Sequence, residues 1–296
     1  MSRRGKGPWP LNNKEQTVKL WFVQRMGTSL EEDERQPVCD LALEYISGQS
    51  KGMRIAMSYL YSESEIDRLA VVAEDVASGI PIQYALGQTY FAGLNINIQP
   101  GALIPRPETE ELLAAFVHRL GGDFDGEVVD IGTGSGCIAL SVKDKFGSAG
   151  VFAVDISSEA LEIAMKNSDE LGLDVEFECS NVLCSKPFGG KMFDAVISNP
   201  PYIPEKERAD MEIRVKDFEP SEALFVPDED PLLFYNRIIA LCEDGMLKKG
   251  GVLGLECHCD FAQEVFEKLH SSNKWQDVEL IVDLGEKMRY VLAVFL

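Results

Sequence analysis

Hydrophobic positions have a helical spacing early in the chain and a mixture of strand and helix spacings later. Over residues 37–86, apolar side chains recur every three or four positions until Pro81, which predicts a small helical domain. Residues 1–36 are polar and mixed, and we expect them to form a partly mobile tail. Over residues 87–101, apolar positions alternate around Ala92-Gly93, which predicts a hairpin that links two domains.

From residue 102 to residue 296, short apolar runs alternate with segments of helical periodicity. Strands are expected at 128–131, 150–155, 175–179, 193–198, 251–256, 278–282 and 290–295. Helices are expected from a cap at Glu108 or Thr109, at 137–146, at 158–171, from Asp230-Pro231, and at 260–270. This alternation predicts an α/β domain over residues 102–296, in which helices cover both faces of a mainly parallel sheet.

Composition is that of an ordinary globular chain with a sizeable core. The 296 residues are 45% hydrophobic and 26% charged. No run of about 18 apolar residues occurs, so no membrane span is expected, and no apolar stretch of a secretory signal follows the first residues. The seven cysteines are scattered and odd in number, which favours free thiols and a cytoplasmic location.

The charge balance is strongly acidic. A formal net charge of −21 repels phosphate backbones, so a broad nucleic-acid-binding surface is not expected. A small basic patch remains compatible with this number, and so does a basic protein partner.

A glycine-rich loop, "VVDIGTGSGCIAL", runs from a strand through a turn into a helix. Gly132, Gly134 and Gly136 would let the backbone approach a ligand at the carboxyl end of the sheet, and Asp155 ends the next strand, where a carboxylate can accept both hydroxyls of a ribose. A dinucleotide is the alternative ligand, but its G-x-G-x-x-G fingerprint would need a third glycine at Cys137. A tight turn without a ligand is the remaining alternative.

A second motif, "FDAVISNPPYIP", ends a strand at the same edge of the sheet. Pro200 and Pro201 make a rigid loop, which by itself would only terminate the strand. Beside a cofactor, however, the Asn199 side-chain carbonyl and the Pro200 backbone carbonyl could both accept N–H groups from a planar amide or amine. Tyr202 could stack on that group, and catalysis would consist mainly of positioning.

Both motifs resemble those of methyltransferases. The D-x-G-x-G-x-G loop is similar to motif I of class I S-adenosylmethionine-dependent methyltransferases, and N-P-P-Y is similar to the signature of amino-methyltransferases. Three further segments accompany them, namely "LIPRPETE", "FEPSEAL" and the terminal "DLGEKMRYVLAVF". In the order of these segments, residues from about 79 to 296 resemble the release factor glutamine N5-methyltransferases. That family implies a Rossmann-like, mainly parallel sheet with an antiparallel C-terminal strand, preceded by a small helical domain.

The resemblance also implies the ligands and the residues that bind them. The cofactor would be S-adenosyl-L-methionine, and the partner would be a release factor, gripped in part by residues 37–86 and methylated on the glutamine of its Gly-Gly-Gln motif. The residues implied in cofactor binding are Asp130, Gly132, Thr133, Gly134, Ser135, Gly136, Asp155, Val182 and Asn199. The substrate would be bound by Asn199, Pro200, Pro201 and Tyr202, of which Asn199, Pro200 and Tyr202 are the expected catalytic residues.

Two departures from the family pattern and several alternatives accompany this interpretation. The family commonly has an aspartate and a large residue where this chain has Asn181-Val182, and "LECHCD" replaces a glutamate-x-glycine pattern. In "ECHCD", a metal site is not expected, because strand alternation would direct the cysteines away from His258. Arg106 is expected to join Glu108 and its acidic neighbours at a helix start. Two other functions remain open, namely methylation of exocyclic amines of adenine or guanine in nucleic acid and a binding module without catalysis.

Overall fold

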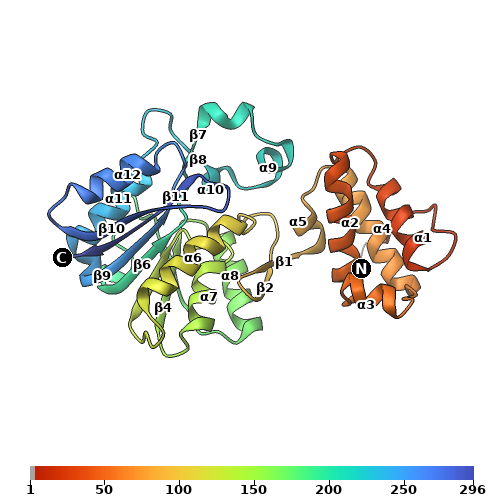
Figure 1. Ribbon diagram of the computed structural model, residues 1–296, viewed down its shortest axis with the longest axis horizontal. Coiled ribbons are helices and arrows are strands. Elements are labelled where there is room, and N and C mark those ends of the chain that lie inside the picture. Colours follow the sequence, from red (N-terminus) through yellow and green to blue (C-terminus); the bar gives the residue numbers. More distant parts are fainter. Residues whose placement is uncertain (1–3) are drawn as a thin grey trace. The chain divides into compact units, whose positions relative to one another are not determined.

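The computed structural model describes residues 4–296, so residues 1–3 of the expected tail lie outside the described residues. The chain divides into two compact units (Figure 1). Unit 1 contains the residues up to Gln88 together with Glu212–Phe218, and unit 2 contains Thr89–Met211 and Glu219–Leu296. No helix of the described residues is both long and apolar enough to cross a membrane.

Unit 1 is a helical bundle. Its helices are α1 (Glu15–Arg25), α2 (Glu32–Ser47), α3 (Lys51–Ala56), α4 (Glu63–Ala77), α5 (Ile82–Leu86) and α9 (Ile213–Phe218). The prediction of a polar tail is wrong for α1, because its Val18 and Phe22 are fully buried in the core of the bundle. Leu20, an apolar residue between these positions, is exposed, so the apolar residues of this helix do not show the spacing of a single face.

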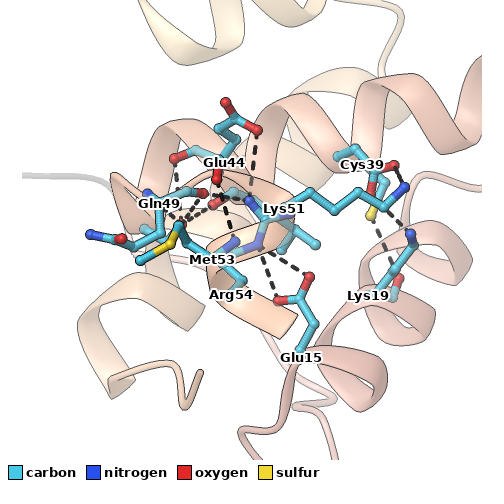
Figure 2. A network of polar contacts seen from close by, with 12 residues as sticks. Glu15, Lys19, Cys39, Glu44, Gln49, Lys51, Met53 and Arg54 are labelled. Carbon is cyan, nitrogen blue, oxygen red and sulfur yellow. Dashed lines mark hydrogen bonds and ion pairs between the residues drawn. The ribbon is translucent and has the colours of Figure 1, made fainter. Parts of the chain in front are cut away.

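A buried ion pair connects the helices of unit 1 (Figure 2). The side chain of Arg54 on α3 is fully buried, and its Nε donates to both carboxylate oxygens of Glu15 on α1, at 3.1 and 3.2 Å. Its Nη1 donates to the backbone carbonyl of Gln49 at 2.7 Å, and Tyr61 donates its hydroxyl to Glu15 at 2.6 Å. A single carboxylate therefore compensates a buried charge and orders two other segments.

Unit 2 alternates strands and helices. Its strands are β1 (Gln88–Phe91), β2 (Leu94–Asn97), β3 (Glu127–Ile131), β4 (Gly150–Asp155), β5 (Glu176–Cys179), β6 (Phe193–Ser198), β7 (Ile203–Pro204), β8 (Phe225–Val226), β9 (Leu247–Glu256), β10 (Trp275–Val282) and β11 (Met288–Phe295). Its α-helices are α6 (Pro107–Leu120), α7 (Cys137–Lys145), α8 (Ser158–Leu171), α10 (Ser221–Leu224), α11 (Leu233–Leu241) and α12 (Ala262–His270). Short 3-10 or π turns lie at Phe188–Gly190, Glu205–Ala209 and Cys242–Met246.

Within the described residues, seven strands form the central sheet in the order β10-β11-β9-β6-β3-β4-β5. The neighbours from β9 to β5 pair in parallel, whereas β11 pairs antiparallel with both β9 and β10. The sheet is thus mainly parallel, as the alternation of elements predicts, and its antiparallel C-terminal strand beside β9 agrees with what the family resemblance implies.

Helices cover both faces of this sheet, α11 and α12 on one and α6 and α7 on the other (Figure 1). Each face of the sheet has its own hydrophobic core, and successive strand residues alternate between the two cores. Val129 therefore packs on the face of α11 and α12, and Val128 on the face of α6 and α7. The β1–β2 hairpin, expected to be a linker, is part of unit 2, because Phe91 and Ile96 are fully buried in its second core.

Candidate active site

Strand register brings the two sequence motifs to one edge of the sheet. Ile131, the last residue of β3, is paired with Val154 on one side and with Ser198 on the other. Ser198 is in turn paired with Leu255 of β9. The residues that follow these four positions therefore emerge side by side, and they are Gly132, Asp155, Asn199 and Glu256.

A pocket opens at this edge, and its lining comes from seven segments of unit 2. The lining residues are Gly101, Ala102, Leu103, Ile131, Gly132, Gly134, Val154, Asp155, Ile156, Ser157, Ala160, Ser180, Asn181, Val182, Leu183, Asn199, Pro200, Pro201, Pro220, Glu222, Ala223 and Phe234. The glycine loop and the start of the N-P-P-Y motif thus contribute to one pocket. Two further contributors were not anticipated, the segment before α6 and the "FEPSEAL" segment, although both belong to motifs of the resembling family.

The glycine loop has a backbone shape that glycine favours. Gly132 and Gly134 have φ angles of +74° and +55°, in the left-handed region. The Gly134 N–H donates to Asp155 Oδ2 at 2.8 Å, and the Ser157 N–H donates to Oδ1 of the same carboxylate at 2.9 Å. Burial raises the pKa of Asp155, and these backbone donors oppose that rise. Asp155 therefore fixes the loop while it also lines the pocket.

Other residues expected to bind the cofactor lie beneath the loop instead of lining the pocket. Asp130 is fully buried, and it accepts the Thr133 hydroxyl at 2.6 Å. Burial raises the pKa of Asp130 to about 7. Thr133 and Ser135 are also buried, and the Ser135 carbonyl accepts Asn167 Nδ2 at 2.9 Å. This part of the loop is thus supported from inside the protein.

The segment after β5 supplies an apolar wall in place of the large residue of the family pattern. Val182 is buried at the pocket, and its carbonyl accepts Arg237 Nε of α11 at 2.6 Å. The side chain of Asn181 bonds to the backbone of its own segment, since its Oδ1 accepts the Leu183 N–H at 2.9 Å. Phe234 of α11 lines the same pocket, so the aromatic side chain comes from a helix that the sequence motifs did not indicate.

A chain of hydrogen bonds links the two ends of the N-P-P-Y motif. Asn199 Nδ2 donates to Thr109 Oγ1 at 3.0 Å, and this hydroxyl donates to Glu256 Oε2 at 2.7 Å. Tyr202 donates its hydroxyl to Glu256 Oε1 at 3.0 Å. Asn199, Pro200 and Pro201 line the pocket, whereas Tyr202 lines a neighbouring hollow with His258. Sequence reasoning found the motif but missed Thr109 and Glu256.

The expected roles at the start of α6 are wrong. Arg106 is the N-cap and Pro107 the first helical residue, so Thr109 lies inside the first turn and its hydroxyl is free to bond Asn199 and Glu256. Arg106 does not join the acids of its own helix but pairs at 2.5 Å with Glu219, whose side chain is almost fully buried. The same Glu219 carboxylate accepts the Ile104 N–H at 3.1 Å, which connects "LIPRPETE" with "FEPSEAL".

The prediction that strand alternation directs Cys259 away from His258 is also wrong. β9 ends at Glu256, so strand alternation does not extend to the following turn, and ligand atoms of His258, Cys259 and Asp260 lie within 4.8 Å of one another. Both ring nitrogens of His258 have partners, however. Nδ1 accepts the Asp260 N–H at 3.3 Å, and Nε2 lies 3.3 Å from Glu207 Oε2.

Comparisons with known proteins agree with this geometry. Residues 109–220 match the family described as "Methyltransferase small domain". The chain is 44% identical over 213 residues to the release factor glutamine methyltransferase of Bacteroides thetaiotaomicron, covering 72% of this chain and 75% of that protein. It is 35% identical over 261 residues to the protein of the same name from Chlorobaculum tepidum, covering 83% of this chain and 87% of that one.

A solved structure supports the fold class. A 16S rRNA methyltransferase of T. thermophilus, in complex with AdoMet and guanosine, superimposes with a TM-score of 0.50 at 19% identity, covering 71% of this chain and 50% of that one. At this identity the likeness concerns the fold alone. Together with the strand order, it confirms the predicted Rossmann-like methyltransferase fold.

Proposed function

The chain belongs to the release factor glutamine methyltransferases, and we propose that it methylates the side-chain amide nitrogen, N5, of the glutamine in the Gly-Gly-Gln motif of release factors. The resemblance inferred from the sequence is confirmed, and the chain is an S-adenosylmethionine-dependent methyltransferase. We propose the cytoplasm as the place of reaction, because release factors act there.

The pocket has the chemistry that S-adenosyl-L-methionine requires. Bound there, the cofactor supplies a methyl group on a positively charged sulfur. Asp155 offers a carboxylate to the ribose hydroxyls, while Val182 and Phe234 offer apolar surface to the adenine. Gly132 and Gly134 leave room for the methionine portion, since neither carries a Cβ. The acidic residue, the apolar wall and the glycine loop thus each match one portion of the ligand.

Asn199 and Pro200 align the substrate in this proposal. An amide nitrogen is a poor nucleophile because its lone pair is delocalised into the carbonyl group. The Asn199 Oδ1 and the Pro200 carbonyl oxygen would each accept one N–H of the glutamine amide, which favours a geometry with the lone pair toward the methyl group. Such positioning can supply about 7 kcal/mol or more of the barrier reduction in favourable cases.

The single observation that carries the proposal is that Asn199 and Pro200 line the same pocket as the glycine loop and Asp155. Methyl acceptor and donor groups can therefore meet without rearrangement of the sheet edge. For the helical unit 1, we propose the role implied by the family, recognition of the release factor outside its glutamine. The described fold of unit 1, with α1 included, supplies a stable body for that role.

Mass spectrometry tests the proposal directly. The enzyme and S-adenosylmethionine are incubated with a release factor, and the Gly-Gly-Gln peptide is sequenced by fragmentation. One added methyl group on the glutamine side chain is expected. A release factor in which this glutamine is replaced by alanine is the control and should remain unmodified. Methylation at another residue, or of added RNA or DNA alone, would contradict the proposal.

A further inference from the structure

We propose that Thr109 and Glu256 are positioning residues that determine which atom of the Asn199 side-chain amide is presented to the substrate. This inference rests on the proposed function of Asn199 as an acceptor for the glutamine N–H. Neither residue lines the pocket, so neither would touch the substrate or the cofactor.

The amide of Asn199 has two chemically opposite ends of nearly equal size. Its Oδ1 can accept the N–H of a substrate amide, whereas its Nδ2 can only donate and would repel that N–H. A rotation of half a turn exchanges the two ends with little change in shape. The asparagine is therefore useful to the reaction only if something outside the pocket distinguishes its oxygen from its nitrogen.

The hydrogen bonds to Thr109 and Glu256 make this distinction. Burial raises the pKa of Glu256, and the hydrogen bonds from Thr109 and Tyr202 and the charge of Arg289 oppose that rise. As a carboxylate, Glu256 can only accept, so the Thr109 hydroxyl, 2.7 Å from Oε2, directs its single proton to it. The Thr109 oxygen then has only lone pairs left, and its neighbour at 3.0 Å must be a donor. That donor is Asn199 Nδ2, and Oδ1 is left for the pocket. The Glu256 carboxylate thus fixes the orientation of the Asn199 amide through the Thr109 hydroxyl.

Burial makes this arrangement effective. Thr109 is 3% exposed and Glu256 is 1% exposed, so water does not compete freely for these groups. The second oxygen of Glu256 accepts the Tyr202 hydroxyl at 3.0 Å. A single buried carboxylate thereby holds Asn199 indirectly and Tyr202 directly, and it fixes both ends of the N-P-P-Y segment.

Removal of the hydroxyl is the first test. Thr109→Val keeps the shape of the side chain but offers no acceptor to Asn199 Nδ2. We expect kcat for the release factor to fall about 10- to 100-fold, the effect of one hydrogen bond to a charged network, while the Kd for S-adenosylmethionine changes less than about twofold. Thr109→Ser, which restores the hydroxyl, should recover kcat to within about threefold of the parent enzyme.

Reversal of the orientation is the second test. In Glu256→Gln, the amide oxygen can still accept from Tyr202, which turns the new NH₂ group toward Thr109. The Thr109 hydroxyl would then donate to Asn199 and draw Oδ1 away from the pocket. The fall in kcat should be at least as large as for Thr109→Val. Thr28 is exposed, and Thr28→Val is the matched control for Thr109→Val.

A measurement without substrate separates this inference from the proposed function. The cofactor-bound protein is labelled with ¹⁵N-asparagine, and the side-chain NH₂ resonances of Asn199 are assigned by their loss in Asn199→Ala. These resonances should shift in Thr109→Val and should keep the positions of the parent enzyme in Thr109→Ser. If these resonances shift while the parent enzyme methylates no release factor, the proposed function fails, whereas the orientation of the Asn199 amide by Thr109 stands. Unshifted resonances, or a Thr109→Ser enzyme as slow as Thr109→Val, would overturn the inference.

Discussion

Three acidic side chains at the carboxyl ends of parallel strands in the central sheet have separate tasks in this protein. Asp155, at the end of β4, lines the pocket and accepts two backbone N–H groups. Asp130, near the end of β3, is enclosed below the glycine loop. Glu256, at the end of β9, holds Thr109 and Tyr202. An acidic side chain thus lines the pocket, supports the loop or holds other side chains, according to its burial and partners.

Substitution of Asn199 by alanine tests its proposed role in alignment. The variant loses one of the two acceptors for the substrate amide but keeps the glycine loop and Asp155. We expect kcat to fall at least about 100-fold, because alignment of the nitrogen contributes several kcal/mol. The Kd for S-adenosylmethionine, measured by calorimetry, should change less than about threefold, since that contact is one of many.

Asp155→Ala is the reciprocal control. It removes the expected partner of the ribose together with the acceptor of the Gly134 N–H. The Kd for S-adenosylmethionine should rise about tenfold or more, the value of a lost hydrogen bond to a charged group. An Asp155→Ala protein that binds the cofactor as the parent does, or an Asn199→Ala protein that loses binding and turnover equally, would contradict the assignment.

The raised pKa of Asp130 predicts a pH dependence of stability. A carboxyl whose pKa is about 7 in the folded protein binds a proton more tightly than in the unfolded chain, where its pKa is about 3.9. Its contribution to stability is therefore complete below about pH 4 and is lost as the pH rises through about 7. In Asp130→Asn no proton is lost, so its melting temperature relative to the parent should rise from pH 5 to pH 8.

Thermal unfolding of the cofactor-free proteins measures this difference. Asp123→Asn, on the surface, controls for the loss of one negative charge. A melting-temperature difference between Asp130→Asn and the parent that stays constant or falls with pH would show that the Asp130 carboxylate is accommodated without penalty.

At the scale of elements, we expect the buried pair of Glu15 and Arg54 to contribute to the stability of unit 1. Glu15→Gln keeps the shape but leaves the fully buried guanidinium without its partner, apart from Glu44, whose carboxylate lies 4.0 Å from Nη1. We expect a loss of about 3 kcal/mol, the low end of the range for a broken buried pair. Asp40→Asn, which breaks more exposed pairs with Lys19 and Lys51, should lose about 1 kcal/mol or less.

Chemical denaturation of the whole chain measures both variants, and hydrogen exchange locates the change. In Glu15→Gln, amides of α1, α3 and α4 should exchange faster, while those of β3 and β4 should be unaffected. Equal losses for the two variants would show that burial of Arg54 adds nothing to the pair.

The sequence predicts elements whose information is local. Two predicted strands, 150–155 and 193–198, agree with the observed strands residue by residue, because apolar runs between turn residues define them. The meeting of the glycine loop with Asn199 was also predictable, since parallel strands place their carboxyl ends at one edge. Helix α1 was missed because three of its residues are buried while the apolar Leu20 among them is exposed, so the sequence does not show a single apolar face.

The link from Asn199 to Glu256 was not predictable, because it depends on which strands are neighbours. β6 and β9 are adjacent in the sheet but distant in sequence, and only their register places Glu256 next to Asn199. Thr109 comes from a third segment, where a threonine near a helix start is ordinarily interpreted as a cap. A motif therefore identifies the residues that would touch ligand, whereas the residues that orient them emerge only with the sheet order.

At the scale of the whole molecule, charge distinguishes the protein substrate from the nucleic-acid alternative. The N-P-P-Y motif alone does not, because it would serve the exocyclic amine of adenine or guanine as well as a glutamine amide. With 28 lysines and arginines against 49 aspartates and glutamates, the chain offers little counterion release to a phosphate backbone. Its field instead slows the approach of RNA and DNA, and it accelerates the approach of a basic protein surface.

We therefore expect the Kd for an RNA hairpin or a DNA duplex to be weaker than about 10⁻⁴ M at physiological salt, the weak limit of non-specific binding. Fluorescence anisotropy measures this affinity, and a radiolabelled methyl group on the cofactor reports any transfer to the nucleic acid. A release factor, added in the same reaction, is the positive control. Micromolar binding that weakens steeply as salt is raised would reveal a basic patch that the net charge conceals. Only if such binding were accompanied by methyl transfer to the base would the exocyclic amine replace the glutamine, because Asn199 and Pro200 can align either group once it reaches the pocket.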